Sequence, residues 1–305
     1  MVTTDNPATA RDRPVFDTPN ILWFFGAFTA AVASDAVISQ VHSSSRAVWI
    51  LLASLAFLAA FAVLSAWLLR SGWWVAGGVL AAMAVTFVGP AGGSFERLIG
   101  VWRTGASLDP IQEFEGPAFA LVLAIAVAGL IAFAIVRFPF ILAIVVLAAF
   151  FAAQLLLPVV VSSPSAADHA TAFIVVGGAL IVVGLTLDLA RLRSEAFWWH
   201  LVGLTALSIG FGYHAFRHST WGWVLIFVVG TVILSFATFL LRGTWAVFGV
   251  AGVYAPIAHY LNAWLGTLGT AFALAAAGVG LVALGLAARR YGGTWPERPR
   301  RPVPV

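Results

Sequence analysis

Residues 117–136 read PAFALVLAIAVAGLIAFAIV, and after a single arginine, Arg137, residues 138–161 read FPFILAIVVLAAFFAAQLLLPVVV. Neither stretch contains a charged residue, and each has the roughly 20 apolar residues that an α-helix needs to cross the hydrocarbon of a bilayer. Two such stretches joined by one arginine predict a transmembrane helical hairpin, because a longer lipid-exposed connection would leave backbone groups without hydrogen bonds.

The composition of the whole chain indicates the same kind of fold. Of the 305 residues, 62% are hydrophobic and 9% are charged, and the mean hydropathy is +1.01. Soluble domains contain about 25% charged residues, so this chain has too few to cover a surface exposed to water. Cysteine is absent, which excludes disulfides and thiolate metal sites. All 16 basic residues are arginine, so a lysine Schiff base is excluded as well.

The same length criterion predicts an all-α, polytopic transmembrane helical bundle of about ten helices. The predicted spans lie at residues 20–41, 47–69, 72–92, 117–136, 138–161, 169–188, 196–216, 221–241, 243–263 and 265–288. They form a single transmembrane domain, residues 20–288. A polar N-terminal tail, residues 1–19, precedes it, and an Arg/Pro-rich C-terminal tail, residues 289–305, follows it.

The first predicted span has a second interpretation. Arg11 and Arg13 precede an apolar stretch that ends in Ala31-Val32-Ala33 before Ser34, which is the pattern of a cleaved secretory signal. Cleavage after Ala33 would leave nine helices. The long polar leader and the continuation of the apolar run to Ile38 favour an uncleaved first helix.

The arginines predict the orientation of the bundle. With ten spans and a cytoplasmic N-terminus, the outer segments contain Arg46, Arg97, Arg103 and Arg217, and the inner segments contain the other 12 of the 16 arginines. The positive-inside rule therefore predicts that both termini are cytoplasmic, in a multi-pass protein of the plasma (inner) membrane. The arginines are scattered between apolar runs, which indicates that they determine the orientation of the helices in the membrane. Nucleic acid is therefore not an expected partner.

One long connection, residues 94–116, lies on the predicted external side. Phe95, Leu98, Ile99 and Trp102 recur at helical spacing, which predicts an amphipathic segment on the membrane surface. A solvated connector is the favoured role of this segment, and a loop that gates or collects substrate is the alternative.

Ionisable side chains inside the spans are candidates for chemistry, because burying them in lipid is costly. Asp35 lies in the outer part of the first span, either as a proton- or cation-binding carboxylate or as an interfacial residue bonded to nearby serines. His214 and His218 are four residues apart and share one helix face, and His259 lies toward the same external side. Asp35, His214, His218 and His259 therefore form one candidate site for an ion, a proton or a substrate.

The histidines also raise the question of metal or haem. His214 and His218 have the spacing of a zinc or copper ligand pair, and His214 with His259 offers two axial nitrogens for a haem. Arg217 adds repulsive positive charge between the first two, and two histidines alone do not define a metal site. No cofactor is predicted, and metal binding stays an open alternative.

A second candidate site lies at a predicted cytoplasmic connection. Asp188, Arg191, Arg193 and Glu195 fall between two spans, and Phe197-Trp198-Trp199-His200 follow them. Asp188 and Arg191 are three residues apart, a spacing that allows an ion pair. This segment is a candidate cytoplasmic gate, whereas the ordinary role of arginines at such a position is to anchor the topology.

The expected partners are the lipid bilayer and other membrane helices. Glycine and alanine fill the last two spans, and small side chains let helices approach closely, within the bundle, in a homo-oligomer or against another membrane protein.

Two classes of function fit these features. A secondary transporter or channel for a small solute or ion explains the many spans and the sparse ionisable groups within them. A membrane-embedded scaffold, sensor or assembly subunit is the alternative, and a haem- or metal-binding protein is a weaker one. The chain has no glycine loop with a phosphate-binding lysine, no HExxH and no GxSxG motif, so an enzyme is not the favoured reading. Neither the substrate nor the partner is specified.

Overall fold

The computed structural model describes residues 18–39, 46–101, 115–217, 219–240 and 242–292. In these ranges the regular structure is helical throughout and contains no strand, which confirms the predicted all-α class. The helices, in chain order, are α1 (Thr18–Ser39), α2 (Arg46–Arg70), α3 (Trp74–Thr86), α4 (Val88–Leu98), α5 (Gly116–Val136), α6 (Ile141–Leu155), α7 (Leu157–Val160), α8 (Ala166–Leu189), α9 (Arg193–Arg217), α10 (Ser219–Leu240) and α11 (Gly243–Gly292).

Three long helical segments are interrupted at single positions. α3 and α4 are separated at Phe87, α6 and α7 at Leu156, and α11 bends at Gly266. Pro158 follows the second interruption and lacks the N–H that a continuing helix needs. Gly266 has φ 68° and ψ 179°, a conformation that is essentially restricted to glycine. The predicted boundary between the last two spans lies two residues before this bend.

Five helical segments of the described residues are long and apolar enough to cross a membrane. They are Arg46–Arg70, Trp74–Leu98, Gly116–Val136, Ile141–Val160 and Ala166–Leu189. Shorter apolar helices occur at Phe25–Ser34 and Trp221–Ala237. These lengths and compositions support a membrane protein, and helices are present within all ten ranges predicted as spans.

The predicted surface segment, residues 94–116, is only partly described. α4 continues from the preceding span through Phe95 to Leu98, so helix extends beyond the predicted end of that span at residue 92. The side chains of Phe95, Leu98 and Ile99 are exposed. Trp102 lies outside the described residues.

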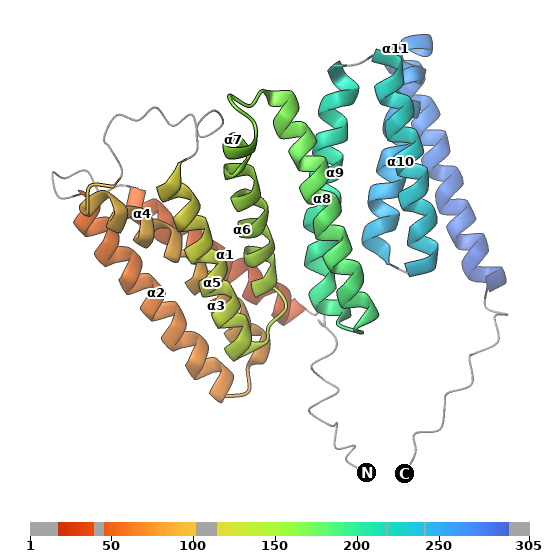
Figure 1. Cartoon of the computed structure of the whole chain (residues 1–305). Helices are drawn as coiled ribbons and strands as arrows, with labels where there is room; N and C mark the ends of the chain where they lie inside the picture. Colours follow the sequence, from red (N-terminus) through yellow and green to blue (C-terminus); the bar gives the residue numbers. More distant parts are fainter. Residues whose placement is uncertain (1–17, 40–45, 102–114, 218, 241, 293–305) are drawn as a thin grey trace, which may run out of the picture.

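The helices form two groups that lie side by side (Figure 1). The first half is α1–α7, and its largest core is built around α3, which is buried along most of its length. The second half is α8–α11, in which α8 packs along α9 and α10 packs along α11. The packing between the halves is carried mainly by α6, which contacts both α8 and α9.

With α3–α4 and α6–α7 each counted as one segment, successive helical segments run in opposite directions, so their connections alternate between two ends. The α2–α3, α5–α6, α8–α9 and α10–α11 connections lie at one end, the lower one in Figure 1. We call it the arginine-rich end, because five described arginines belong to these connections: Arg70, Arg137, Arg191, Arg193 and Arg242. Arg46, Arg97 and Arg217 belong to helix ends at the opposite side. The predicted topology places the same arginines on the same sides.

Candidate functional site

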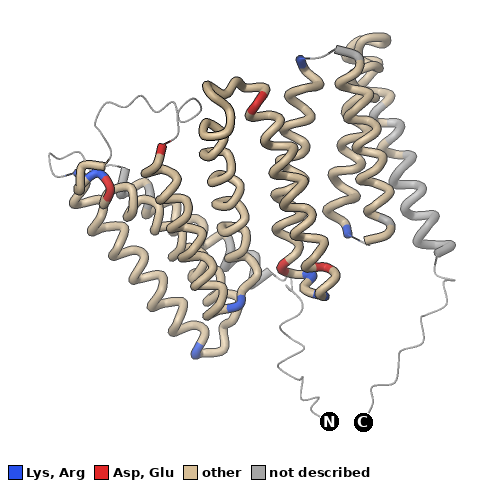
Figure 2. Tube along the Cα trace, viewed as in Figure 1, with Lys and Arg blue, Asp and Glu red and all other residues tan. Residues whose placement is uncertain are grey.

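The charged residues that Figure 2 colours lie at the two ends of the bundle, and the tan parts of the tube between them carry no charged side chain. This distribution follows from the cost of placing an ionised group in hydrocarbon. At the arginine-rich end, three side chains from different helices meet.

Asp188 is the centre of this group. It lies in the last turn of α8, and its Oδ2 accepts a hydrogen bond from Arg242 Nε at 3.0 Å. Arg242 Nη2 donates to the other carboxylate oxygen, Oδ1, so the guanidinium binds the carboxylate through two parallel bonds. His200 Nε2, from the second turn of α9, lies 2.9 Å from Oδ2. We call these three side chains the Asp188 network.

The Asp188 network is largely shielded from solvent. The side chain of His200 is 0% exposed, that of Asp188 is 13% exposed and that of Arg242 is 11% exposed. An ion pair removed from water is stable only when both partners remain, because either charge left alone keeps its full desolvation cost. Arg242 Nη2 also donates to the backbone carbonyl of Arg193 at 3.0 Å. Arg242, just before α11, thus binds both the end of α8 and the start of α9.

Close packing fixes the position of the imidazole. A Cβ atom added at Gly184 would lie 2.8 Å from His200 Cε1, so only glycine leaves room for the ring at this point of α8. On another side, Trp245 of α11 meets the ring edge to face, with centroids 5.4 Å apart. A carboxylate can only accept hydrogen bonds, so His200 Nε2 is the donor in this contact. His200 Nδ1 and Trp245 Nε1 are buried without a hydrogen-bond partner.

The predicted cytoplasmic gate overlaps this network in part. Asp188 contributes its side chain and Arg193 its carbonyl. The Asp188 side chain pairs with Arg242 and His200, whereas Arg191 donates its backbone N–H to the Asp188 carbonyl at 2.9 Å. Glu195 accepts a hydrogen bond from Ser194 at 2.8 Å. Their role as a gate stays a prediction.

The second predicted site is more dispersed. His214 Nε2 lies 3.3 Å from Thr171 Oγ1 on α8, and the ring of His259 on α11 stacks on Trp223 of α10, with centroids 4.2 Å apart. α1, which includes Asp35, packs against α2 and α3 in the other half. The side chains of Asp35 and His218 lie outside the described residues. Among the described residues, no group of three or more potential metal ligands is present.

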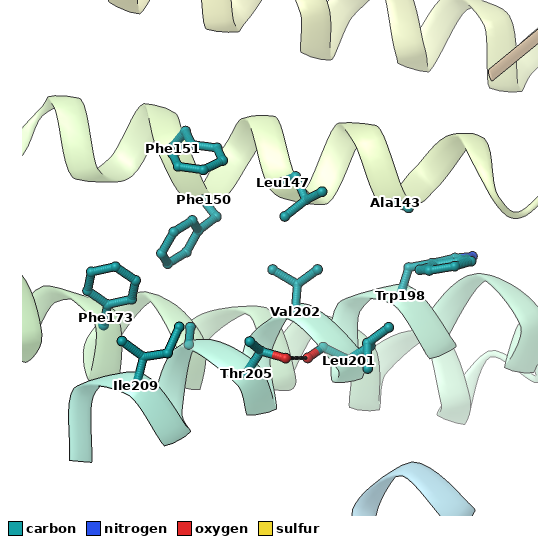
Figure 3. Close-up of a pocket in the computed structure, with 11 residues that line it drawn as sticks. Ala143, Leu147, Phe150, Phe151, Phe173, Trp198, Leu201, Val202, Thr205 and Ile209 are labelled. Carbon is teal, nitrogen blue, oxygen red and sulfur yellow. Dashed lines mark hydrogen bonds between the residues drawn. The ribbon is translucent and has the colours of Figure 1, made fainter. Parts of the chain in front are cut away.

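An open apolar cavity of about 500 Å³ lies between the two halves (Figure 3). Leu147 and Phe150 of α6 form one wall, Thr205 and Ile209 of α9 form the other, and Phe173 of α8 lies at one end. The Thr205 hydroxyl donates to the Leu201 carbonyl at 2.8 Å. We call this cavity the α6–α9 groove. Sequence analysis did not predict it, because it arises where two distant helices stay apart.

Comparisons with protein-family models, with curated proteins and with solved structures found no match.

Proposed function

We propose that this protein is a multi-pass membrane transporter or channel for a small solute or ion, and that the Asp188 network closes its arginine-rich end. The observation that supports this proposal is that Arg242 binds the carboxylate of Asp188 and the carbonyl of Arg193 together. These bonds tie the α10–α11 connection to the α8–α9 connection.

An ion pair that is shielded from solvent can hold a gate closed and still allow it to open. When the two connections separate, water enters and hydrates both the carboxylate and the guanidinium. The hydration recovers much of the desolvation cost that the closed state bears. The open and closed states therefore differ little in free energy, which is the condition for a two-state gate.

The proposed topology has ten crossings, with both termini and the arginine-rich end in the cytoplasm. It rests on the 12 of 16 arginines that the sequence places on the inner side. The alternation of the helix connections between two ends is consistent with it. The corresponding location is the plasma (inner) membrane.

Flux measurements in liposomes test the gate, and the chain offers a matched control. Arg242 follows Leu240-Leu241 at one hairpin, and Arg70 follows Leu68-Leu69 at another. We expect Arg242→Gln to raise proton or cation leak about tenfold, which corresponds to about 1.4 kcal/mol lost from the closed state. Arg70→Gln is expected to leave the leak unchanged. Absence of flux through the wild-type protein under proton, sodium and potassium gradients would count against the proposal.

The alternative function, a membrane-embedded scaffold, sensor or assembly subunit, is favoured by a different observation. Leu268, Phe272 and Val279 lie on α11 beyond the bend at Gly266, at spacings of four and seven residues, and all three side chains are strongly exposed. This row is a face that another transmembrane helix can cover. If wild-type liposomes show no flux and the protein elutes with one partner at fixed stoichiometry, disrupted by Leu268→Asn, the scaffold replaces the transporter as the function.

A further inference from the structure

The α6–α9 groove runs lengthwise along the bundle. α6 and α9 both begin at the arginine-rich end, and the groove starts there, beside Ala143 and Trp198. It ends beside Phe151 and Ile209 (Figure 3). The eleven residue steps from Trp198 to Ile209 correspond to about 16 Å along the helix axis.

The lining of the groove is almost entirely apolar. Its one hydroxyl, that of Thr205, already donates to the Leu201 carbonyl. Phe150 and Ala206 are buried in its floor, whereas Leu147, Phe151 and Ile209 are about half-exposed at its margins. The groove is therefore open toward the outside of the bundle, where the membrane hydrocarbon would lie. A water molecule in the groove would lose hydrogen bonds, whereas a hydrocarbon chain needs none.

Aromatic pairs lie near both ends of the groove. Near the arginine-rich end, Phe140 and Trp198 meet edge to face with ring centroids 5.1 Å apart. Near the other end, the ring centroids of Phe150 on α6 and Phe173 on α8 are 4.9 Å apart. Phe150, Phe173 and Trp198 of these pairs line the groove. The narrow apolar volume of about 500 Å³ fits a hydrocarbon chain that lies along the groove.

Positive charge lies at the start of the groove. Arg193 is the first residue of α9, about 7.5 Å before Trp198 along the axis, and Arg137 precedes α6. Both side chains are exposed, as is that of Arg191. Nearby, Glu195 carries the opposite charge, and the Asp188 carboxylate is neutralised by Arg242. Apart from that pair, three arginines face one glutamate.

We propose that the α6–α9 groove binds one acyl chain of an anionic phospholipid, whose phosphate lies at the arginine-rich end near Arg137 and Arg193. Basic residues at the membrane surface attract anionic headgroups, and burial of methylene groups in the groove supplies the apolar part of the binding energy. The inference is independent of the proposed function.

Native mass spectrometry of the purified full-length protein tests the site. The probes are phosphatidylglycerol and phosphatidylcholine with the same acyl chains, added at equal concentration to delipidated protein in detergent. We expect one phosphatidylglycerol to be retained in preference to phosphatidylcholine. The double variant Arg137→Gln/Arg193→Gln should abolish this preference, because each arginine is expected to strengthen the binding of the anionic lipid about fivefold. Arg70→Gln, at the same end but on α2, should not change it.

A second pair of variants tests the groove itself. Thr205→Phe fills it and should weaken phosphatidylglycerol binding about tenfold, the effect of losing about two buried methylene groups. Thr231→Phe on α10 is the matched control, because Thr231 is also exposed and also bonds the carbonyl four residues earlier, at 2.8 Å. Leu147→Trp, from the opposite wall, repeats the test if Thr205→Phe misfolds. Equal retention of the two lipids by the wild type would overturn the proposal, as would unchanged binding by the groove-filling variants.

Discussion

Asp188→Asn is expected to destabilise the detergent-solubilised protein by roughly 3 kcal/mol, the lower range for removing one partner of a buried ion pair. The substitution keeps the size of the side chain but removes the negative charge. Arg242 then remains largely buried without a counter-ion, and its two parallel bonds to the carboxylate are lost. Thermal unfolding followed by circular dichroism measures the effect as a lower midpoint.

A double-mutant cycle separates the ion pair from other effects of the substitution. Because Asp188 and Arg242 act on each other, the double variant Asp188→Asn/Arg242→Gln should lose clearly less stability than the sum of the two single variants. Glu195→Gln is the control, since its carboxylate accepts a hydrogen bond from the neighbouring Ser194, and we expect a change in the free energy of unfolding below about 1 kcal/mol. Additive losses at positions 188 and 242 would show that the pair contributes no coupling.

Gly203→Leu is expected to separate α8 from α9 and to destabilise the second half by about 3 kcal/mol, the upper range for overpacking. A Cβ atom at Gly203 would lie 2.8 Å from the Gly177 carbonyl oxygen, and a Cβ atom at Gly177 would lie 2.7 Å from the Gly203 carbonyl oxygen. Both obstacles are backbone atoms, so no side-chain rotation relieves them. Such close approach is what small residues allow between membrane helices.

The same helix provides the control for this prediction. A Cβ atom at Gly212 would meet nothing within 4 Å, so Gly212→Leu should retain the wild-type unfolding midpoint to within about 1 kcal/mol. Cysteine pairs introduced across α8 and α9 can report the separation directly, because the native chain has no cysteine. Equal midpoints for Gly203→Leu and Gly212→Leu would contradict the packing described here.

The sequence predicts the helices well because the signal is local. A run of about 20 apolar residues identifies each long segment without knowledge of its neighbours, and Arg70, Arg137 and Arg242 mark hairpins that the structure confirms as connections between helices. The bend at Gly266 lies two residues beyond the predicted boundary between the last two spans, inside the span predicted at residues 265–288.

The partner of Asp188 was beyond the reach of local patterns. Arg191 is three residues away in the chain, but the guanidinium that binds the carboxylate belongs to Arg242, 54 residues further on. The available signal was that both residues were predicted at connections on the same side of the membrane. Choosing between Arg191 and Arg242 requires the packing of α8 against α9 and of α9 against α10, which no spacing rule supplies.

The glycine contacts between helices could also be predicted only in part from the sequence. Those of the last two spans were predicted to allow close helix packing, and Gly252 does meet Gly230 of α10. The contact between Gly177 and Gly203 was not predicted, because a glycine is informative only when the residue facing it across the interface is known. Gly178 and Gly212, which lie close to them in sequence, face open space.

The division of the chain into two halves also bears on biogenesis. The largest core of the first half is made by residues between Ala27 and Ile144, all of which precede α8 in the chain. Chains are synthesised from the N-terminus, and early units can fold before later ones exist. The first half can therefore assemble beside the ribosome while α8–α11 are still being made. α6 then offers the surface onto which the α8–α9 hairpin is added as it leaves the insertion machinery.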